Sequence, residues 1–493
     1  MKEKISAARG SRASRALRAL GALLNRGPTP YIVSPALLIL GIILVYLSPR
    51  SIPAFLLFIG AAALTYFLDM NKIAKLAIAV MVAVVIVPVL GARNISYLEI
   101  IFQIAVFSAL ALGLNIVVGF SGLLNFGYMA FYAVGAYLWG FFGSQQPFLL
   151  HAIPGTVPAG TPFFLAPDWF YLFLFLGIIV AAIVGLLLGL PVLRVRGDYL
   201  AIITLGFGEV VRQLLNNLDK PLNLTNGPQG ITPIQRPTLP NGPLAFFNKL
   251  FEPLIGTPVT VSVFYNIMFY LIAVMVVVAV IVVTHRFEDS KIGRAWAAIR
   301  EDELAATAMG IPANRLKLGA FAVGASFAGA MGVLIAASRT FISPDSFSFL
   351  QSVSILTMVI LGGIGSIPGV IIGATVVILL NQQVLQSFSL FLAQLRQSEA
   401  VIPILNLHWK DLSNQLDPSK YQRLVFGIIL ILMMIYRPAG ILPAARRKRE
   451  LKGDEAMDEG TDEAEGPENG AGTPENGAGT PENGADAKEA DRG

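Results

Sequence analysis

Cysteine is absent from this chain of 493 residues, and histidine occurs only three times. Without cysteine the chain has no disulfide, no thiol nucleophile and no thiolate ligand for a metal. His151, His285 and His408 lie far apart in the sequence and show no metal-ligand spacing, so we expect no metal site. Neither a Ser/His/Asp arrangement nor a pair of carboxylates stands out, and we therefore expect no catalytic residue and no enzyme acting alone.

Charged residues are also scarce, at 14% of the chain against about 25% in globular proteins. Hydrophobic residues make up 55% of the chain and recur in runs about as long as a membrane-spanning helix. Strands of alternating polarity, which an outer-membrane barrel would need, are absent. Because backbone groups in lipid must be satisfied locally, we predict an all-α fold, a polytopic integral membrane bundle of helices.

The apolar runs predict about eight to eleven full crossings, and the short or glycine-rich runs predict broken or re-entrant helices. A basic segment at 1–30 precedes them, and residues 31–96 hold accessory spans before a membrane domain at 97–443. The expected spans cover residues 31–47, 52–68, 73–91, 97–119, 122–142, 170–193, 199–218, 264–284, 318–337, 352–363, 370–380 and 424–436.

Positive charge indicates on which side of the membrane each connection lies. The residues before the first span, those after the last span and the loop 285–317 are all basic. Basic flanks are typical of the cytoplasmic side, so we place both termini and this loop in the cytoplasm. Residues 382–422 carry mixed charge, and we expect a partly ordered hairpin on the outer face, with Trp409 at the interface.

After the last span the composition changes abruptly. Residues 444–493 hold an acidic seven-residue repeat that begins at Pro467, with almost no large apolar residue. Such a segment cannot bury a core, so we predict a disordered cytoplasmic tail. The tail is expected to be dispensable, with a regulatory role as the alternative.

The stretch 293–310 is charged and alanine-rich, yet it lies between two apolar runs. Asp289 or Ser290 can cap the start of a helix here, and Gly310 followed by Pro312 predicts its end. Helices that lie on a membrane surface favour Lys and Arg on the polar face, so the acidic residues favour docking of a soluble protein instead. The residues expected to meet that protein are small, apolar or acidic: Ala305, Ala306, Trp296, Ile299, Met309, Glu301, Asp302 and Glu303.

Glycine and asparagine recur within the apolar stretch 111–127, which contains Asn115, Ser121 and Asn125. Both residue types weaken a helix, and such breaks survive in a membrane where they are buried or line a wet cavity. Close packing of helices through small residues is the alternative, and the residues alone leave the two open.

Two further features carry polar or flexible residues within apolar surroundings. Glu209 is a functional candidate because acidic residues in spans are costly, but an ion pair with Arg212 one turn later is the interpretation we favour. The glycine-rich stretch 361–369 lacks the Gly-Lys-Ser/Thr of a phosphate-binding loop, so we predict a break between two half-spans there.

Four motifs, in order along the chain, resemble those of ABC importer permeases for branched-chain amino acids. Residues 303–310 (Glu-Leu-Ala-Ala-Thr-Ala-Met-Gly) resemble the EAA loop of ABC importers, and 111–127, continuing to Tyr137, resemble the signature of the branched-chain branch. Residues 197–228 and 436–443 are similar to the LivM-type permease subunit. The spans before residue 97 and the repeat tail depart from the family pattern.

The resemblance implies a LivM-like subunit that transports branched-chain amino acids across the inner membrane of a prokaryote. Its implied partners are a LivH-like second permease, two ABC ATP-binding subunits that hold ATP and Mg, and an extracytoplasmic solute-binding protein. Besides these proteins we expect contact with membrane lipid, no nucleic acid and no cofactor in this chain. The alternatives are an ABC permease for urea, amides or other amino acids, and an ion-coupled secondary transporter that uses Glu209.

The resemblance also assigns roles to residues. It implies a coupling helix that fits a cleft on the ATP-binding subunit, and a passage between the two permeases. The coupling residues are Gly293, Arg294, Glu301, Asp302, Glu303, Ala305, Ala306 and Gly310. The candidates for the passage are Asn115, Ser121, Asn125, Tyr128 and Glu209.

Deletion of residues 454–493 is expected to leave uptake of the transported solute nearly unchanged, because a solvated tail contributes no packing or docking surface. Uptake into cells, compared with the full chain at matched expression, measures this. A marked loss of transport would show that the tail regulates the protein.

Overall fold

A computed structural model describes most of the chain between residues 29 and 443. Two compact units divide the chain, Met1–Ala444 and Ala445–Gly493, and all of the described residues belong to the first. The basic N-terminus, Trp409 and the acidic tail lie outside the described residues, so the expectations for them stay predictions. The described residues are 29–48, 51–151, 160–192, 198–239, 242, 245, 247–249, 258–397, 401–402, 407–408, 418–437 and 440–443.

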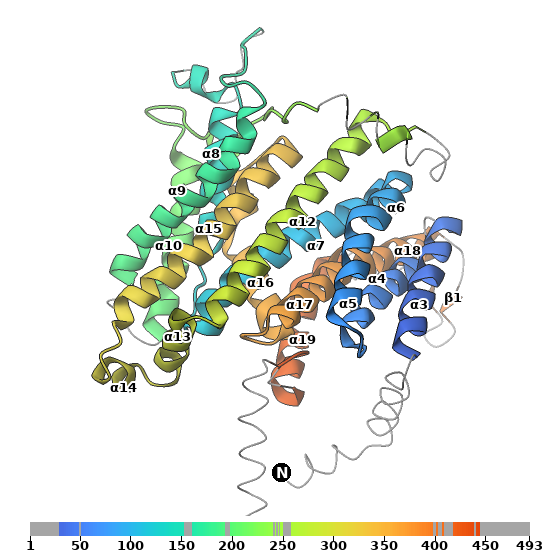
Figure 1. The fold of residues 1–493 in the computed structure, drawn as a ribbon. Coiled ribbons are helices and arrows are strands. Elements are labelled where there is room, and N and C mark those ends of the chain that lie inside the picture. The colour runs from blue at the N-terminus through green and yellow to red at the C-terminus, as the bar shows by residue number, and fades with distance from the viewer. Residues whose placement is uncertain are drawn as a thin grey trace, which may run out of the picture. The chain divides into compact units, whose positions relative to one another are not determined.

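Helices dominate the structure (Figure 1). In the first half the order is α3 (Thr29–Leu47), α4 (Ile52–Phe67), α5 (Lys72–Met81), η1 (Val82–Ile86), α6 (Val87–Arg93), α7 (Ile95–Asn115), η2 (Ile116–Phe120), α8 (Met129–Phe142), η3 (Gln146–Leu149), α9 (Trp169–Val192), α10 (Asp198–Asn217) and η4 (Gly227–Gln229). In the second half it is α12 (Val261–Glu288), α13 (Lys291–Glu301), α14 (Glu303–Ala308), α15 (Ala313–Arg339), η5 (Pro344–Phe347), α16 (Phe349–Gly362), α17 (Ile367–Leu379), η6 (Leu380–Leu385), α18 (Gln386–Gln397), β1 (Val401–Ile402), β2 (Leu407–His408), η9 (Pro418–Tyr421) and α19 (Gln422–Tyr436).

Among the described residues, eight helices are long and apolar enough to cross a membrane. Shorter apolar helices lie at Ile52–Phe67, Met129–Phe142 and Leu424–Tyr436. This confirms the predicted polytopic all-α bundle. The expected span at 199–218 forms α10, which is helical throughout but is in neither group, because its polar residues lower its hydropathy.

Two expected boundaries are wrong. The span expected from residue 122 begins only at Met129, because the preceding residues take non-helical conformations. The region expected as a hairpin from residue 382 begins as helix up to Gln397, because α17, η6 and α18 form one apolar helix over Ile367–Gln394. Apolar side chains continue at helical spacing through Val384, Phe388 and Phe391, which favours extending the helix. Among the residues described between 382 and 422, the short antiparallel β1–β2 pair has the expected hairpin form.

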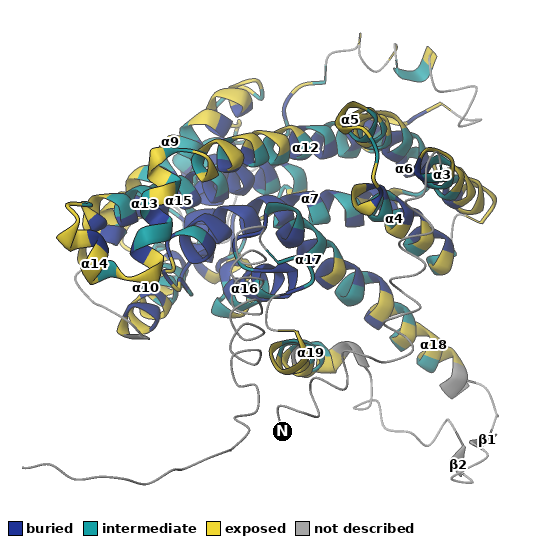
Figure 2. Cartoon of the chain, turned by 60° about the horizontal axis from the view of Figure 1, so that its bottom comes forward, coloured by how far each residue is buried: buried dark blue, intermediate teal, exposed yellow. Residues whose placement is uncertain are grey.

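The centre of the bundle is formed by α7 and α15. Within the most apolar window of each, 78% of the residues are buried, against 22% for the helix Lys72–Arg93 at the periphery. Figure 2 shows this contrast, with α7 mainly dark blue and the outer surfaces of α3 and α5 yellow. α15 packs against α7, α8 and α9, and α7 also packs against α12 and α17. The outer helices therefore offer exposed apolar surface, as lipid contact requires.

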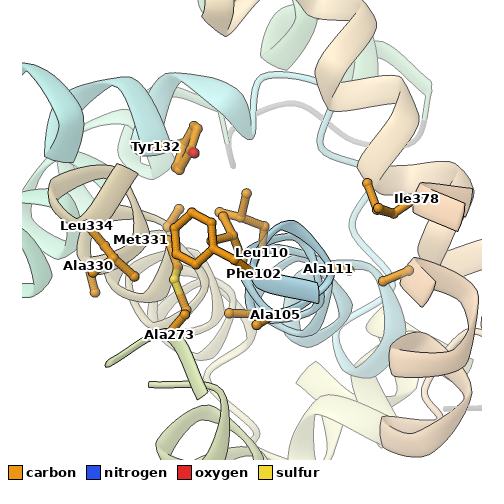
Figure 3. Close-up of a cluster of buried hydrophobic side chains, with 14 of the residues drawn as sticks. Phe102, Ala105, Leu110, Ala111, Tyr132, Ala273, Ala330, Met331, Leu334 and Ile378 are labelled. Atoms are coloured by element: carbon orange, nitrogen blue, oxygen red, sulfur yellow. The ribbon is translucent and has the colours of Figure 1, made fainter. Parts of the chain in front are cut away.

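Side chains from four helices fill the space between α7 and α15 (Figure 3). Phe102 and Leu110 of α7 lie beside Met331 of α15, with Tyr132 of α8 and Ala273 of α12 around them. All five residues are buried. This packing fixes the positions of α7, α8, α12 and α15 relative to one another, and α7 and α15 carry residues of the candidate site.

Glycine allows α15 to approach α8 and α9 closely. A Cβ atom on Gly329 would lie 2.2 Å from the carbonyl oxygen of Gly177, and one on Gly135 would lie 2.0 Å from that of Gly329. Helix packing in membranes relies on such small residues, because without them the backbones must separate.

Gly329→Ala is expected to destabilise the detergent-solubilised protein by about 1–3 kcal/mol, because a methyl group there meets backbone and not a movable side chain. Thermal unfolding measures the change. Gly319→Ala on the same helix is the matched control, since a Cβ atom on Gly319 has nothing within 4 Å. Equal melting temperatures for the two variants would contradict the close packing.

Candidate functional site: an exposed helical loop attached to breaks in the membrane helices

The loop between α12 and α15 contains two helices that meet at a corner, which the sequence did not predict. Ser290 caps α13 as expected, because its Oγ accepts a hydrogen bond from Gly293 N at 3.2 Å. Asp302 leaves the helical region at φ −151° and starts α14 by accepting hydrogen bonds from Leu304 N and Ala305 N at 2.8 and 3.0 Å. The acidic residue that was expected to contact a partner is therefore also a helix cap.

Gly310 ends α14 as predicted. Its φ of +83° lies in the left-handed region, which favours glycine. The Gly310 N–H donates to Thr307 O at 2.9 Å, and the Ile311 N–H donates to Ala306 O at 3.1 Å. This pair of bonds is the Schellman arrangement, with glycine at its left-handed position. A Cβ atom on Gly310 would meet nothing within 4 Å, so the turn itself faces open space.

The outward face of the loop differs from the one expected. Trp296 and Ile299 are 1% and 4% exposed, so the expectation that they contact a partner is wrong. Their periodicity directs them onto α15, where Trp296 Nε1 donates to Leu316 O at 2.8 Å. Ala306 is also buried, whereas Ala305 is exposed. The large apolar residues that do face outward are Leu304 at 69%, Met309 at 84% and, less fully, Ile292 at 39% exposure.

Glu303 faces inward and is paired. Its Oε1 lies 2.7 Å from Nζ of Lys317, whose side chain is only 9% exposed. An ammonium group buried to this degree needs a partner, so the pair fixes α14 against the start of α15. Glu301 and Arg294 remain on the exposed surface, and Gly293 lies where a Cβ atom would be 2.1 Å from Phe287 O. The expected coupling residues thus divide into an outward set and a set that holds the loop in place.

Arg300 connects this loop to the membrane domain. Its Nη1 donates to Gly119 O at 2.6 Å, at the end of the π-helical segment η2. Its Cγ lies against Gly122, where a Cβ atom would be only 2.9 Å away. The last carbonyls of a helix have no partner within the helix, so a guanidinium is a suitable donor for them. In the sequence Arg300 is one of several basic residues of the loop 285–317, and no spacing indicates its contact with a residue 181 positions away.

The chain is broken after Gly119, which is one of the two interpretations that the glycines and asparagines left open; close packing is present as well, since a Cβ atom on Gly113 would lie 3.1 Å from Gly324 O. Residues 121–128 lack regular helix, and side chains hold their backbone in place. Asn125 Oδ1 accepts from Gly127 N at 2.9 Å, and Thr204 Oγ1 on α10 accepts from Phe126 N at 3.1 Å. The Tyr128 hydroxyl donates to Gly324 O on α15 at 2.8 Å. The break is therefore fixed to α10 and α15 and is not a free loop.

A second break lies between α16 and α17, as the glycine-rich stretch predicted, but the expected half-spans are wrong, because Pro344–Gly362 and Ile367–Gln394 are each long and apolar enough to cross a membrane. Gly363 and Gly365 have φ of +119° and +83°, and Ser366 caps the next helix. Asn115 Oδ1 accepts from Gly365 N at 2.8 Å and so ties the two breaks together. The C-terminal motif also packs here, since Ile441 N and Leu442 N donate to Leu361 O and Gly362 O. Three of the sequence motifs thus meet at one place.

The predicted passage residues are buried in this structure. Asn115, Ser121, Asn125 and Tyr128 are at most 2% exposed, and Ser121 Oγ donates to Val117 O at 2.6 Å. The Nδ2 groups of Asn115 and Asn125 have no acceptor among the described residues, so each retains donors that another conformation or a ligand could satisfy. Whether these residues line a passage stays a prediction.

Glu209 forms the ion pair that we favoured. Its Oε1 lies 2.5 Å from Arg212 Nη2 and 2.9 Å from Nε, and Arg212 Nη1 also contacts Asp345 at 3.1 Å. The carboxylate is therefore neutralised by its neighbour, and the side chain is 45% exposed. Glu209 therefore differs from the other four passage candidates, which are buried. Among the described residues, no group of three or more His, Asp or Glu side chains gathers in a way that could hold a metal ion.

Known proteins resemble this chain over most of its length. Residues 96–434 match the family described as "Branched-chain amino acid transport system / permease component". The high-affinity branched-chain amino acid transport system permease protein LivM of Salmonella typhimurium is 38% identical over 379 residues, covering 75% of this chain and 74% of that protein. LivM of Escherichia coli is 37% identical with the same coverage. The related permease LivH of Salmonella typhimurium is 25% identical over 337 residues, 68% of this chain and 91% of LivH. No solved structure matches the chain.

Proposed function

The chain belongs to the family of branched-chain amino-acid transport permeases, and we propose how it moves its substrate. It is a multi-pass membrane protein and a transport permease subunit. The named relatives include both LivM and LivH, which implies a pair of permeases in such a transport system. The proposed substrates are leucine, isoleucine and valine, and the proposed location is the cytoplasmic membrane with both termini in the cytoplasm.

The proposed motor is separate from this chain. Two ABC ATP-binding subunits would bind ATP and Mg, and an extracytoplasmic solute-binding protein would deliver the substrate to this chain and a LivH-like permease. Closure of the ATP-binding subunits must change the permeases mechanically, which requires contacts that differ between the two states. The loop α13–α14 is the proposed receiver of this force.

The observation that carries the proposal is that the loop has an outward apolar face and an inward attachment. Leu304 and Met309 point out, which suits a cleft on another protein. On the inner side, Arg300 contacts the break at Gly119, and Asn115 links that break to the one at Gly365. A displacement of α13 would therefore move both breaks together. The ion pair of Glu209 with Arg212 supports this mechanism over ion-coupled transport, because the carboxylate already has a partner.

Reconstitution tests the proposal. Proteoliposomes should contain this chain, its LivH-like partner and the ATP-binding subunits, with the binding protein added outside. Vesicles whose ATP-binding subunits face the lumen should accumulate radiolabelled L-leucine only when ATP is enclosed in the lumen. Urea and acetamide, supplied in parallel, test the alternative substrates. ATP-independent uptake by the purified chain under an ion gradient would contradict the proposed mechanism.

A further inference from the structure

A cavity of about 230 Å³ lies at the end of the bundle away from the α13–α14 loop. It is lined by the N-terminal parts of α7 and α12, by the end of α15 and by Arg236. Along α12, its Asn266 is roughly 33 Å from Glu288 at about 1.5 Å per residue. At about 30 Å³ per water molecule the cavity has the volume of about eight waters, so it suits a solute of the size of a small amino acid. None of its residues belongs to the breaks or the loop described above.

The rim of the cavity carries charges of both signs. Arg339 Nη1 lies 2.6 Å from Glu99 Oε1, and both side chains are nearly half exposed. Arg236 Nη2 donates to Ser338 O at 3.1 Å, and its guanidinium lies 5.4 Å from the centre of the Tyr265 ring. Arg236 Nε is buried and has no acceptor among the described residues. Two guanidinium groups beside a single carboxylate leave an excess of positive charge, which favours a ligand that brings its own carboxylate.

One part of the cavity wall is apolar, although Asn266 also lines it. Phe102 is 5% exposed and Phe269 is 1% exposed, and both line the cavity. An aliphatic side chain placed against these rings would leave water, while the charged end of the same molecule stays at the rim. A wall of this kind discriminates by size and shape, and the rim orients the ligand.

We propose that this cavity is an entry site that binds an apolar α-amino acid as its zwitterion. Arg236 binds the carboxylate, Glu99 binds the ammonium group, and the aliphatic side chain faces Phe102 and Phe269. The proposal rests on the proposed transport of branched-chain amino acids and adds the place where the substrate first contacts this chain. In the orientation proposed above, this end of the bundle faces away from the cytoplasm. It therefore lies on the side from which the solute-binding protein would deliver the substrate.

Binding of radiolabelled L-leucine to the purified permease pair with its ATP-binding subunits, in the absence of the binding protein, tests the site. Arg236→Gln and Glu99→Gln should each weaken binding about tenfold or more, as expected when a hydrogen bond to a charged group is lost. Lys72→Gln is the control, because Lys72 is exposed and lies at the start of α5, outside the cavity. Melting temperatures show whether each variant folds, and Arg236→Lys, which retains the charge, should recover part of the affinity.

Ligand analogues separate binding from a merely structural role. The unmodified complex should bind leucine more tightly than leucinamide, which lacks the carboxylate, and Arg236→Gln should lose this preference. Unchanged leucine binding and unchanged preference in both variants would overturn the site while leaving ATP-driven uptake, and hence the proposed function, intact. A zwitterionic lipid headgroup offers the same chemistry. If the variants release bound phosphatidylethanolamine in native mass spectrometry but bind leucine normally, the cavity is a lipid site and the proposal fails.

Discussion

Arg300→Ala is expected to separate ATP hydrolysis from transport. The variant should still assemble with the ATP-binding subunits, because Leu304 and Met309 are untouched and remain on the outer face. Uptake of leucine should fall about ten- to a hundredfold, since a hydrogen bond to a charged group contributes about 1.5–3 kcal/mol and here transmits the movement of α13 to Gly119. Uptake and ATP hydrolysis, measured on the same proteoliposomes, give the ratio of solute moved to ATP consumed.

The matched control for this variant is Arg315→Ala. Arg315 is an exposed positive residue at the start of α15, so its loss removes the same charge from the same region. The control should retain the normal ratio. If uptake and ATP hydrolysis fell in proportion in Arg300→Ala, the residue would serve docking or folding, and its proposed role in transmission would be contradicted.

Leu304→Asp and Met309→Asp should have the opposite signature, a failure of assembly. These side chains are 69% and 84% exposed and would be desolvated by the partner, so a carboxylate there must give up its water without a positive partner. Loss of a central interface residue costs about 2–4 kcal/mol, or roughly 30- to 1,000-fold in affinity. Co-purification of the ATP-binding subunits with the tagged permease measures the loss.

A charge introduced at the other end of the bundle is the control for these two variants. Leu222 is 41% exposed in the segment after α10, so Leu222→Asp introduces the same group without touching α14. It should purify with a full complement of ATP-binding subunits. Normal recovery of those subunits with both α14 variants would show that the outward face of this helix is not the docking surface.

The sequence predicted those features of the loop and of the membrane helices that depend on local chemistry. The Ser290 cap, the end at Gly310 and the break at 363–366 all follow from residues whose preferred backbone conformation is strong enough to act alone. The spans were also predictable, because apolar length is a local property. The corner at Asp302 is local too, but a cap within an alanine-rich stretch is weaker than the helical tendency around it, and a single helix was the simpler interpretation.

The direction in which the loop faces could not be predicted in the same way. Trp296, Ile299 and Ala306 look suitable for a partner by composition, but they are buried because α13 and α14 fold back onto α15. The pairing of Glu303 with Lys317 and the contact of Arg300 with Gly119 depend on tertiary packing. The passage candidates Asn115, Ser121, Asn125 and Tyr128 are buried beside the two breaks, and their role in a passage stays a prediction.

Crosslinking from α14 is the most direct test of the claim that this loop receives force from a separate motor. The chain has no cysteine, so Met309→Cys gives a single reactive site on a background that needs no other change. In the active complex this site should crosslink to an ATP-binding subunit, with a yield that changes when ATP is bound, and Leu222→Cys should give no such product. An actively transporting complex in which Met309→Cys never reaches an ATP-binding subunit would contradict the account.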